Sequence, residues 1–344
     1  MNGALEVISP GLHTSVQDLG RLGWQRMGVP VSGALDTESL RLANALVGNS
    51  PETAALEIFH HGPTLAVKAE SIRVALAGGG LIEVLGDYRR TIPAWRSVRL
   101  HRDDVFEVGA LQGTACCYLA VEGGLAISPC LGSRSTYARG SLGGFVGRAL
   151  REGDLVPLVL AEAGGRADLE LPRPPSPRRD QAIRVVLGPQ EDRFTAKSVA
   201  AFLAAEYTVS TSADRMGMRL EGPSLKHKGK RYDIVSDAIV TGAIQVPGNG
   251  QPIVLLADHQ TTGGYPKIAT VISADLPAVG RRLPGDTIRF VAVDVDQAEQ
   301  TRRAQETVLH DLFRTIKAVS AGKEVDLRSL YRLNLISGVV SAQE

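Results

Sequence analysis

The chain has 344 residues, enough for about two domains, and its 44% hydrophobic and 22% charged residues are typical of a folded globular protein, which excludes disorder of the whole chain. Its 38 basic and 37 acidic residues give a formal net charge of +1, so no overall field attracts it to nucleic acid or to a membrane surface. Three cysteines, two of them adjacent, argue against a disulfide scaffold. The first residues lack the features of a signal peptide, and we expect a cytoplasmic protein.

Most of the 37 glycines separate short runs of Val, Ile, Leu and Thr, a pattern that predicts many short strands. The clearest runs are residues 72–77, 81–85, 115–121, 183–187, 238–246, 253–257 and 287–293. Three stretches are predicted to be helical. The first begins after Asp36 and ends near Gly48, the second covers residues 195–206, and the third, which is amphipathic, begins at Asp294 or Asp296.

A proline-rich segment at residues 171–180 is the best candidate for a linker. Four prolines within six positions favour an extended chain without a core of its own. We therefore predict an N-terminal β lobe at residues 1–170, a C-terminal β lobe at residues 181–293, and a helix followed by a tail at residues 294–344.

Two polar, glycine-containing stretches resemble binding loops, since they place hydroxyls and flexible backbone beside apolar strands. Residues 28–36 contain Ser32 and Asp36, although turn and helix-cap duties explain both side chains as well. Residues 132–145 contain Arg134, Ser135 and Thr136, which suit a carboxylate or a ureido oxygen. An ordinary surface loop explains this second stretch equally well.

A third polar stretch, residues 244–266, is the most informative. Its asparagine and glutamines offer a donor and an acceptor without charge, which suits planar amide and ureido groups. Turn chemistry explains residues 247–250. It does not explain the unbroken polar run at residues 258–264, which directly follows a buried strand. The candidate binding residues of this stretch are Asn249, Gln251, His259, Gln260, Thr261, Thr262, Gly263 and Tyr265.

Several common catalytic motifs are missing from the sequence. It has no phosphate-binding glycine loop, no nucleophile elbow and no zinc-ligand pair, which disfavours kinases, dehydrogenases, serine hydrolases and zinc enzymes. His60 and His61 are adjacent, and adjacent residues of a strand point to opposite faces. We therefore predict no metal site.

The stretches at residues 11–21, 28–36, 41–44, 132–136 and 245–266 together resemble the biotin-dependent carboxyltransferase family, also called the allophanate hydrolase subunit 2 family. The resemblance runs from about residue 7 to residue 291. It implies a mainly β fold with a few helices, in which two cyclophilin-like β-barrel lobes lie in tandem.

The resemblance implies a subunit of a heteromeric, ATP-dependent 5-oxoprolinase, which opens 5-oxoproline to glutamate. Two alternatives stay open: a subunit of a urea- or allophanate-type biotin-dependent carboxyltransferase, and a non-catalytic protein that binds its small-subunit homologue and thereby antagonises a kinase inhibitor. The implied partners are a small subunit of the allophanate hydrolase subunit 1 type, a third 5-oxoprolinase subunit and a small amide substrate. ATP would act on the complex at a site that this sequence does not identify.

Biotin, if used, arrives on another protein, because this chain has no Met-Lys pair of the kind that carries biotin. By resemblance, Asn249 is functionally important, and Gln251, His259, Gln260 and Thr262 line a pocket. In a carboxyl transfer we expect Asn249 to stabilise the developing ureido oxyanion and Gln251 and Gln260 to orient the amide substrate. Arg134 would pair with a substrate carboxylate.

Overall fold

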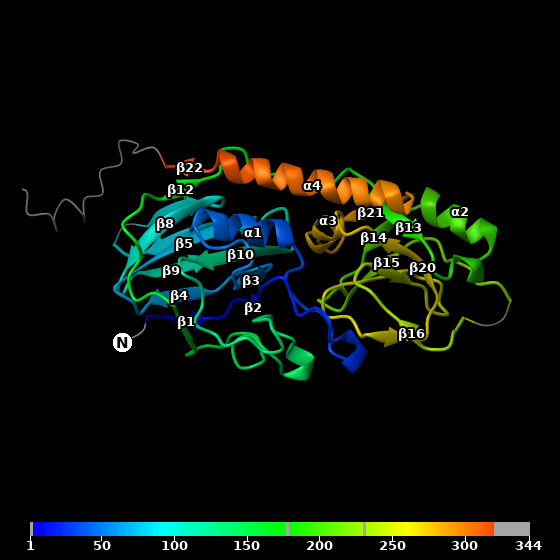
Figure 1. The fold of residues 1–344 in the computed structure, drawn as a ribbon, viewed down its shortest axis with the longest axis horizontal. Helices are drawn as coiled ribbons and strands as arrows, with labels where there is room; N and C mark the ends of the chain where they lie inside the picture. The colour runs from blue at the N-terminus through cyan, green and yellow to red at the C-terminus, as the bar shows by residue number, and fades with distance from the viewer. Residues whose placement is uncertain (1–2, 88, 177–178, 230–231, 320–344) are drawn as a thin grey trace, which may run out of the picture.

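The computed structural model describes residues 3–319 except 88, 177–178 and 230–231. It is mainly β, as expected, and its two β-rich lobes lie side by side beneath the long helix α4 (Val295–Thr315) (Figure 1). The strands of the first lobe form two sheets. The sheet of six holds, in spatial order, β11 (Leu155–Pro157), β1 (Ala4–Ser9), β4 (Thr64–Val67), β9 (Val105–Val108), β6 (Leu81–Leu85) and β7 (Arg90–Pro93).

The second sheet of the first lobe has seven strands, and its last strand comes from the far end of the described chain. In spatial order these are β2 (His13–Gln17), β3 (Ala55–Phe59), β10 (Cys116–Val121), β5 (Ser71–Gly78), β8 (Arg96–His101), β12 (Leu169–Glu170) and β22 (Lys317–Ala318). Helix α1 (Thr37–Leu46) covers β10 and β5.

The second lobe is a closed barrel, as the family resemblance implies for this half. Around the barrel the strands are β13 (Ile183–Leu187), β20 (Lys267–Val271), β17 (Ala243–Gln245), β18 (Ile253–Leu255), β15 (Gly217–Glu221), β14 (Glu206–Val209) and β21 (Thr287–Ala292). A small two-stranded sheet, β16 (Asp237–Ala238) with β19 (Thr262–Gly263), lies outside it. The remaining helices are α2 (Ala196–Ala204), α3 (Leu276–Gly280) and the short 3-10 turns η1 (Gln25–Met27), η2 (Ala138–Gly140) and η3 (Glu191–Arg193).

Strand β10 is buried on both faces and connects the cores of the two lobes. Cys117, Leu119 and Val121 pack between the two sheets of the first lobe. Cys116 and Tyr118, on the opposite face, belong to a second core that continues through α1 into the barrel. Burial on both faces explains why residues 115–121 form a continuous apolar run without polar alternation.

The predicted helices α1, α2 and α4 are all present, and their caps follow the sequence. The Asp36 carboxylate accepts hydrogen bonds from the backbone N–H groups of Glu38 and Ser39, both at 3.1 Å. Asp294 begins α4 with a capping box. Helix α3 was not predicted, because five residues that include Pro277 are too few to show a helical period.

The single strand predicted at residues 238–246 is wrong in its length. The structure divides it into β16 and β17, which are separated by a turn. Gly242 within this turn has a φ of +88°, a left-handed conformation that interrupts a strand and suits glycine. The residues that follow the turn enter the barrel as β17.

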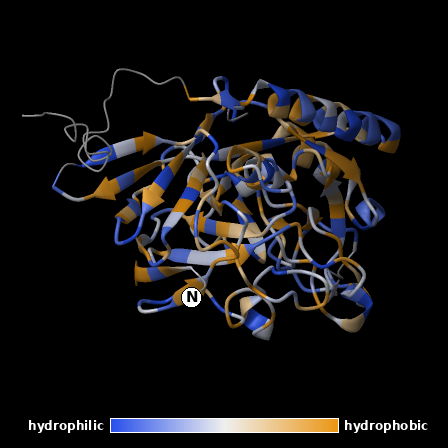
Figure 2. Cartoon of the chain, turned by 60° about the vertical axis from the view of Figure 1, so that its left-hand side comes forward, coloured by the Kyte–Doolittle hydropathy of each residue, from blue (hydrophilic) through white to orange (hydrophobic). Residues whose placement is uncertain are grey.

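Helix α4 contacts both lobes before the chain returns to the first. Arg41 of α1 donates to Glu306 at 2.9 Å, and Arg184 of β13 donates to the Thr301 hydroxyl at 3.3 Å. Leu309 is buried, whereas most of the outward face of α4 is hydrophilic (Figure 2). After α4, β22 pairs antiparallel with β12 of the first lobe. Residues 320–344 of the predicted tail lie outside the described residues.

Candidate functional site

A cleft of about 330 Å³ lies between the two lobes, and we call it the interlobe cleft. Polar side chains from both lobes line it, together with apolar ones such as Leu35, Phe59 and Met216. The polar and charged lining residues are His13, Ser15, Gln17, His60, Thr136, Arg139, Asp214, Arg215, Asp258 and Arg282. A cavity of this size that combines apolar walls with a few polar groups is typical of small-molecule sites.

Strand β2 supplies three polar residues of the first-lobe wall. His13, Ser15 and Gln17 share one face of the strand, because side chains alternate along it. The Gln17 side-chain nitrogen donates to the Ser15 hydroxyl at 3.0 Å and to the backbone carbonyl of Thr136 at 3.2 Å. The Gln17 side-chain oxygen is buried and has no hydrogen-bond partner among the described residues.

His13 is mostly buried at this wall and lies edge-on to the Phe59 ring, with the ring centroids 5.9 Å apart. Burial lowers the pKa of His13, and the positive charge of Arg215 lowers it further. The imidazole is therefore neutral near pH 7 and can accept a proton.

Arg215 joins the two lobes across the cleft. It lies just before β15 and donates to the Asp258 carboxylate at 2.8 and 3.1 Å and to the Gly33 backbone carbonyl at 2.7 Å. It also forms an ion pair with Glu57 of β3. Burial alone lowers the pKa of Arg215, but the carboxylates of Glu57 and Asp258 raise it overall, so the guanidinium is charged.

Glu57 extends this network into the first lobe. Its side chain is fully buried and accepts hydrogen bonds from the Tyr118 hydroxyl at 2.5 Å and from the Leu35 backbone N–H at 2.9 Å. Tyr118 in turn accepts a hydrogen bond from the Asp36 backbone N–H at 2.9 Å. Each buried charge of this network is hydrogen-bonded, so the network fixes how the two walls of the cleft meet.

The predicted binding residues Asp36 and Ser32 lie at the junction of the lobes. The Asp36 carboxylate caps α1 and also accepts a hydrogen bond from Arg281 of the second lobe at 3.0 Å. The Ser32 backbone N–H donates to the Ala257 carbonyl at 3.0 Å, while its buried hydroxyl has no partner in the described part of the chain. Both residues therefore help to join the lobes.

The predicted residues Arg134, Ser135 and Thr136 occupy different environments. Thr136 lines the cleft. The Ser135 hydroxyl and the Arg134 backbone N–H donate to the buried Asp18 carboxylate, each at 2.5 Å. The Arg134 side chain is exposed and donates to the backbone carbonyl of Ile127 at 2.6 Å, so it is not among the residues that line the cleft.

Arg21 is a buried cation behind this loop. It is 1% exposed and donates to the Ser135 backbone carbonyl, but its Nε and Nη1 atoms have no partner among the described residues. Burial lowers its pKa, and the nearby carboxylate of Asp18 opposes that effect. The loop at residues 133–136 is thus supported by one buried carboxylate and one buried guanidinium.

Asn249 and Gln251 lie on a turn of the second lobe, outside the residues that line the cleft. Asn249 is exposed, and its side-chain oxygen accepts a hydrogen bond from the Gln251 backbone N–H at 3.1 Å. The Gln251 amide bonds the Gly222 backbone twice, accepting at 3.0 Å and donating at 3.1 Å. Gln251 therefore positions the turn, and the Asn249 amide nitrogen has no hydrogen-bond acceptor within the described residues.

The other predicted residues of this stretch follow Asp258. His259 is buried, and its ring contacts the Thr241 hydroxyl at 3.2 Å and the Gln260 carbonyl at 2.6 Å. Thr261 is half-buried, Gln260 is exposed, and Thr262 and Gly263 form β19. Tyr265 is 42% exposed. We call residues 247–251 and 259–265 the barrel loops; none of them is among the residues that line the interlobe cleft.

Sequence reasoning did not select His13, Gln17, Glu57, Arg215 or Asp258 as site residues. His13 and Gln17 lie within the stretch at residues 11–21, and their spacing of four places them on the same face of a strand. The alternation of side chains along a strand could therefore have predicted that His13 and Gln17 face the same side. Glu57 and Arg215 are 158 positions apart, and no local pattern could have paired them.

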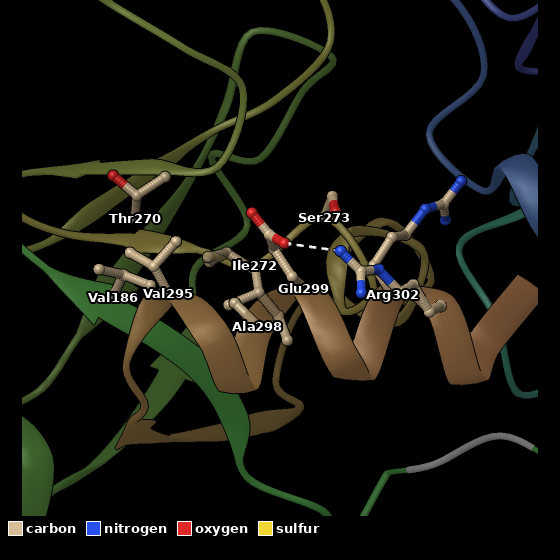
Figure 3. Close-up of a pocket in the computed structure, with 10 residues that line it drawn as sticks. Val186, Thr270, Ile272, Ser273, Val295, Ala298, Glu299 and Arg302 are labelled. Carbon is tan, nitrogen blue, oxygen red and sulfur yellow. Dashed lines mark hydrogen bonds and ion pairs between the residues drawn. The ribbon is translucent and has the colours of Figure 1, made fainter.

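A second cavity, of about 380 Å³, lies between α4 and strands β13 and β20. Figure 3 shows Val186, Val295, Ala298 and Ile272 on its mostly apolar walls. Glu299 and Arg303 at its edge form an ion pair at 3.0 Å. The third charged residue that lines it, Arg302, pairs with Glu306 at 2.6 Å, so in the described chain each charged lining residue has a partner.

The described residues contain no group of three or more His, Cys, Asp or Glu side chains placed to hold a metal ion. Among the helices that the structure describes, none combines the length and apolar character needed to cross a bilayer.

The family model for the carboxyltransferase domain, subdomains A and B, matches residues 27–292. The chain belongs to this family. It is 35% identical over 314 residues to the C subunit of 5-oxoprolinase from Escherichia coli (strain K12), a match that covers 90% of this chain and 97% of that one. It is 34% identical over 334 residues to the urea amidolyase of Lachancea kluyveri, covering 90% of this chain and 18% of the relative.

Solved structures of similar proteins show the same fold. The crystal structure of K. lactis urea amidolyase superimposes with a TM-score of 0.79 at 32% identity, covering 90% of this chain and 20% of that chain. The carboxyltransferase match includes Arg215 and Asp258 of the cleft and Glu57, which pairs with Arg215 behind it. Strand β2 precedes the matched range, and α4 and β22 follow it.

Proposed function

We propose that this chain is the C subunit of a heteromeric, ATP-dependent 5-oxoprolinase and that the interlobe cleft binds the small amide substrate. The observation that carries the proposal is the whole-length similarity to the C subunit of E. coli 5-oxoprolinase, which covers 97% of that protein. The similarity to urea amidolyase covers only 18% of a much longer chain.

The polar groups of the cleft support a role in amide chemistry. The Ser15 hydroxyl accepts from Gln17 and keeps its own proton for donation, so it can bind a lactam carbonyl oxygen. Gln17 holds the Ser15 hydroxyl in place by donating to it at 3.0 Å. In ring opening, the C–N bond of the lactam breaks, water supplies the hydroxyl of the new carboxyl group, and the proton that water loses goes to the released amine nitrogen. The neutral His13 ring is suited to take a proton from the attacking water.

The cofactors and partners belong to the same proposal. ATP acts on the assembled complex, and the residues described here contain neither a phosphate-binding glycine loop nor a cluster of metal ligands. These residues therefore do not fit a Mg-ATP site of the usual kind. We propose that this chain assembles with two others, a small subunit of the allophanate hydrolase subunit 1 type and a third subunit, to give the cytoplasmic enzyme.

A second candidate function is carboxyl transfer of the urea type, with biotin supplied by another protein. It is favoured by the TM-score of 0.79 with K. lactis urea amidolyase. In this reaction the exposed Asn249 amide would stabilise a ureido oxyanion, and the barrel loops would form the reacting surface.

The test is co-expression of the chain with its two candidate partner subunits, followed by measurement of glutamate release from 5-oxoproline. Release that requires ATP and disappears when this chain is omitted supports the proposal. A His13→Gln variant should assemble normally but lower kcat. Failure of a stable complex to release glutamate would reject the 5-oxoprolinase assignment, and carboxylation of urea by the complex with a biotin carrier would favour the second candidate.

A further inference from the structure

Arg282 lines the interlobe cleft and is 5% exposed. It follows α3, and its backbone N–H donates to the Val279 carbonyl at 3.0 Å, which fixes its position. Within the described part of the chain, its guanidinium has neither a hydrogen bond nor an ion pair. A buried guanidinium normally has acceptors for several of its five N–H donors, so Arg282 is an exception that calls for a ligand.

The acids near Arg282 are Asp286 and Asp180, and within the described residues neither forms a hydrogen bond or an ion pair with it. Asp286 accepts from Arg179 at 3.3 Å and from the Leu283 backbone N–H at 2.9 Å. Burial lowers the pKa of Arg282, Asp286 opposes this, and the positive charge of Arg179 lowers it further. Burial therefore destabilises the charged form of Arg282, and a bound anion would stabilise it.

The other charges that line the cleft are paired. Arg215 is bound by Glu57 and Asp258, as described above. Arg139 lies opposite Asp214 at 3.8 Å, where both side chains are largely exposed to water. Among the charged residues of the described chain that line the cleft, Arg282 is therefore a buried cation without a counterion.

We propose that Arg282 binds the carboxylate of a small monocarboxylate in the interlobe cleft. A guanidinium presents two parallel N–H groups that match a carboxylate, and one unpaired cation balances one negative charge. A doubly charged phosphate ester would leave a negative charge beside Asp214 and Asp258. The apolar side chains of Leu35, Phe59 and Met216 suit the hydrocarbon part of the ligand.

The identity of that ligand rests on the proposed function, under which it is 5-oxoproline. This molecule carries a carboxylate on a lactam ring, and β2 offers neutral donors and acceptors to the ring in the same cavity. Arg282 would then select the acid over the otherwise identical ring without a carboxylate. This role replaces the one expected for Arg134, whose exposed side chain does not line the cleft.

The test measures binding of 5-oxoproline and of 2-pyrrolidone, the same ring without its carboxylate, to the full-length chain by calorimetry. We expect the wild-type chain to prefer 5-oxoproline. Arg282→Gln should weaken 5-oxoproline binding roughly tenfold to hundredfold, the range for loss of a charged hydrogen-bonded pair, and leave 2-pyrrolidone binding unchanged. Arg282→Lys should fall between them.

The matched control is Arg289→Gln, which removes an exposed arginine of β21 that pairs with Glu206 at 2.8 Å. It should bind both compounds as the wild type does. A purely structural Arg282 would lower the melting temperature when replaced. Because its charge has no partner, we instead expect Arg282→Gln to melt at the wild-type temperature or higher without ligand, and 5-oxoproline to raise only the wild-type value.

Two results separate this inference from the proposed function. Equal 5-oxoproline affinity of Arg282→Gln and wild type overturns the role of Arg282, even if the complex releases glutamate. If the complex releases none but lactate or another small monocarboxylate binds in an Arg282-dependent way, the carboxylate site stands and the 5-oxoprolinase assignment fails. A wild-type chain that binds no monocarboxylate overturns the inference.

Discussion

The interlobe cleft and the barrel loops are two polar regions built in opposite ways. At the cleft, Arg215 is mostly buried, its partner Glu57 is fully buried, and Arg215 is bonded to residues of both lobes. On the barrel loops, Asn249 and Gln260 are exposed, and the hydrogen bonds of Asn249 stay within its own lobe. The comparison shows two uses of polar residues in one protein. Those at the cleft hold the lobes together, whereas those on the barrel loops are exposed and can contact another molecule.

The largest expected effect is on stability, from Arg215→Met. This change leaves Glu57 and Asp258 as buried carboxylates without their cation, so we expect a loss of about 3–5 kcal/mol in the free energy of unfolding. Chemical denaturation followed by circular dichroism measures it. The control is Arg303→Met, which breaks an exposed pair with Glu299 and should cost about 0.5 kcal/mol or less. Equal losses would show that the cleft network does not join the lobes.

Asn249→Ala tests the other side of the comparison. The side chain is exposed and accepts one backbone hydrogen bond, so the unfolding free energy should change by about 0.5 kcal/mol or less. If the barrel loops stabilise an oxyanion, the activity of the assembled complex should fall by roughly a hundredfold. Ser224→Ala, which removes a hydroxyl bonded to the Asn249 carbonyl at 3.2 Å, is the control and should keep most of the activity. Full activity of Asn249→Ala would exclude the loops from the chemistry.

The pH dependence of stability distinguishes buried from exposed imidazoles. Burial holds the pKa of His13 and His259 below the ordinary value of 6.5, so the unfolded chain binds protons at these residues first. Stability should therefore decrease as the pH falls below about 6.5. His13→Gln should reduce the slope of melting temperature against pH between about pH 7 and 5. An unchanged slope would mean that His13 titrates alike in the folded and unfolded chain.

The smallest expected effect concerns the joint made by α4. Glu306→Ala removes the pair with Arg41 at 2.9 Å and the pair with Arg302 on the same helix at 2.6 Å, and because Arg41 and Glu306 are partly buried we expect a loss of about 1 kcal/mol. Glu299→Ala is the control on the same helix and should cost less, since its pair with Arg303 is exposed. Urea denaturation of both variants provides the comparison. A smaller loss for Glu306→Ala would mean that α4 is held mainly by its apolar face.

Local signals predicted local features of this molecule well. The runs at residues 81–85 and 183–187 became β6 and β13 with the same ends, and Asp36 caps α1 as predicted. The cleft was not predicted, because its charged network joins Glu57 to Arg215 across 158 positions and depends on how the lobes pack. The polar loop at residues 258–264 could be selected from the sequence because it follows an apolar strand. Glu57 is a single polar residue inside β3, and such a residue is common in an ordinary strand.

The pairing of β22 with β12 also affects how the chain folds during synthesis. The first lobe leaves the ribosome long before β22 exists, so β12 keeps an open edge until almost all of the described chain has been made. An open edge can pair with a strand of another nascent chain. A truncated chain that ends before α4 would retain this exposed edge permanently, and it should associate with itself more readily than the full-length protein.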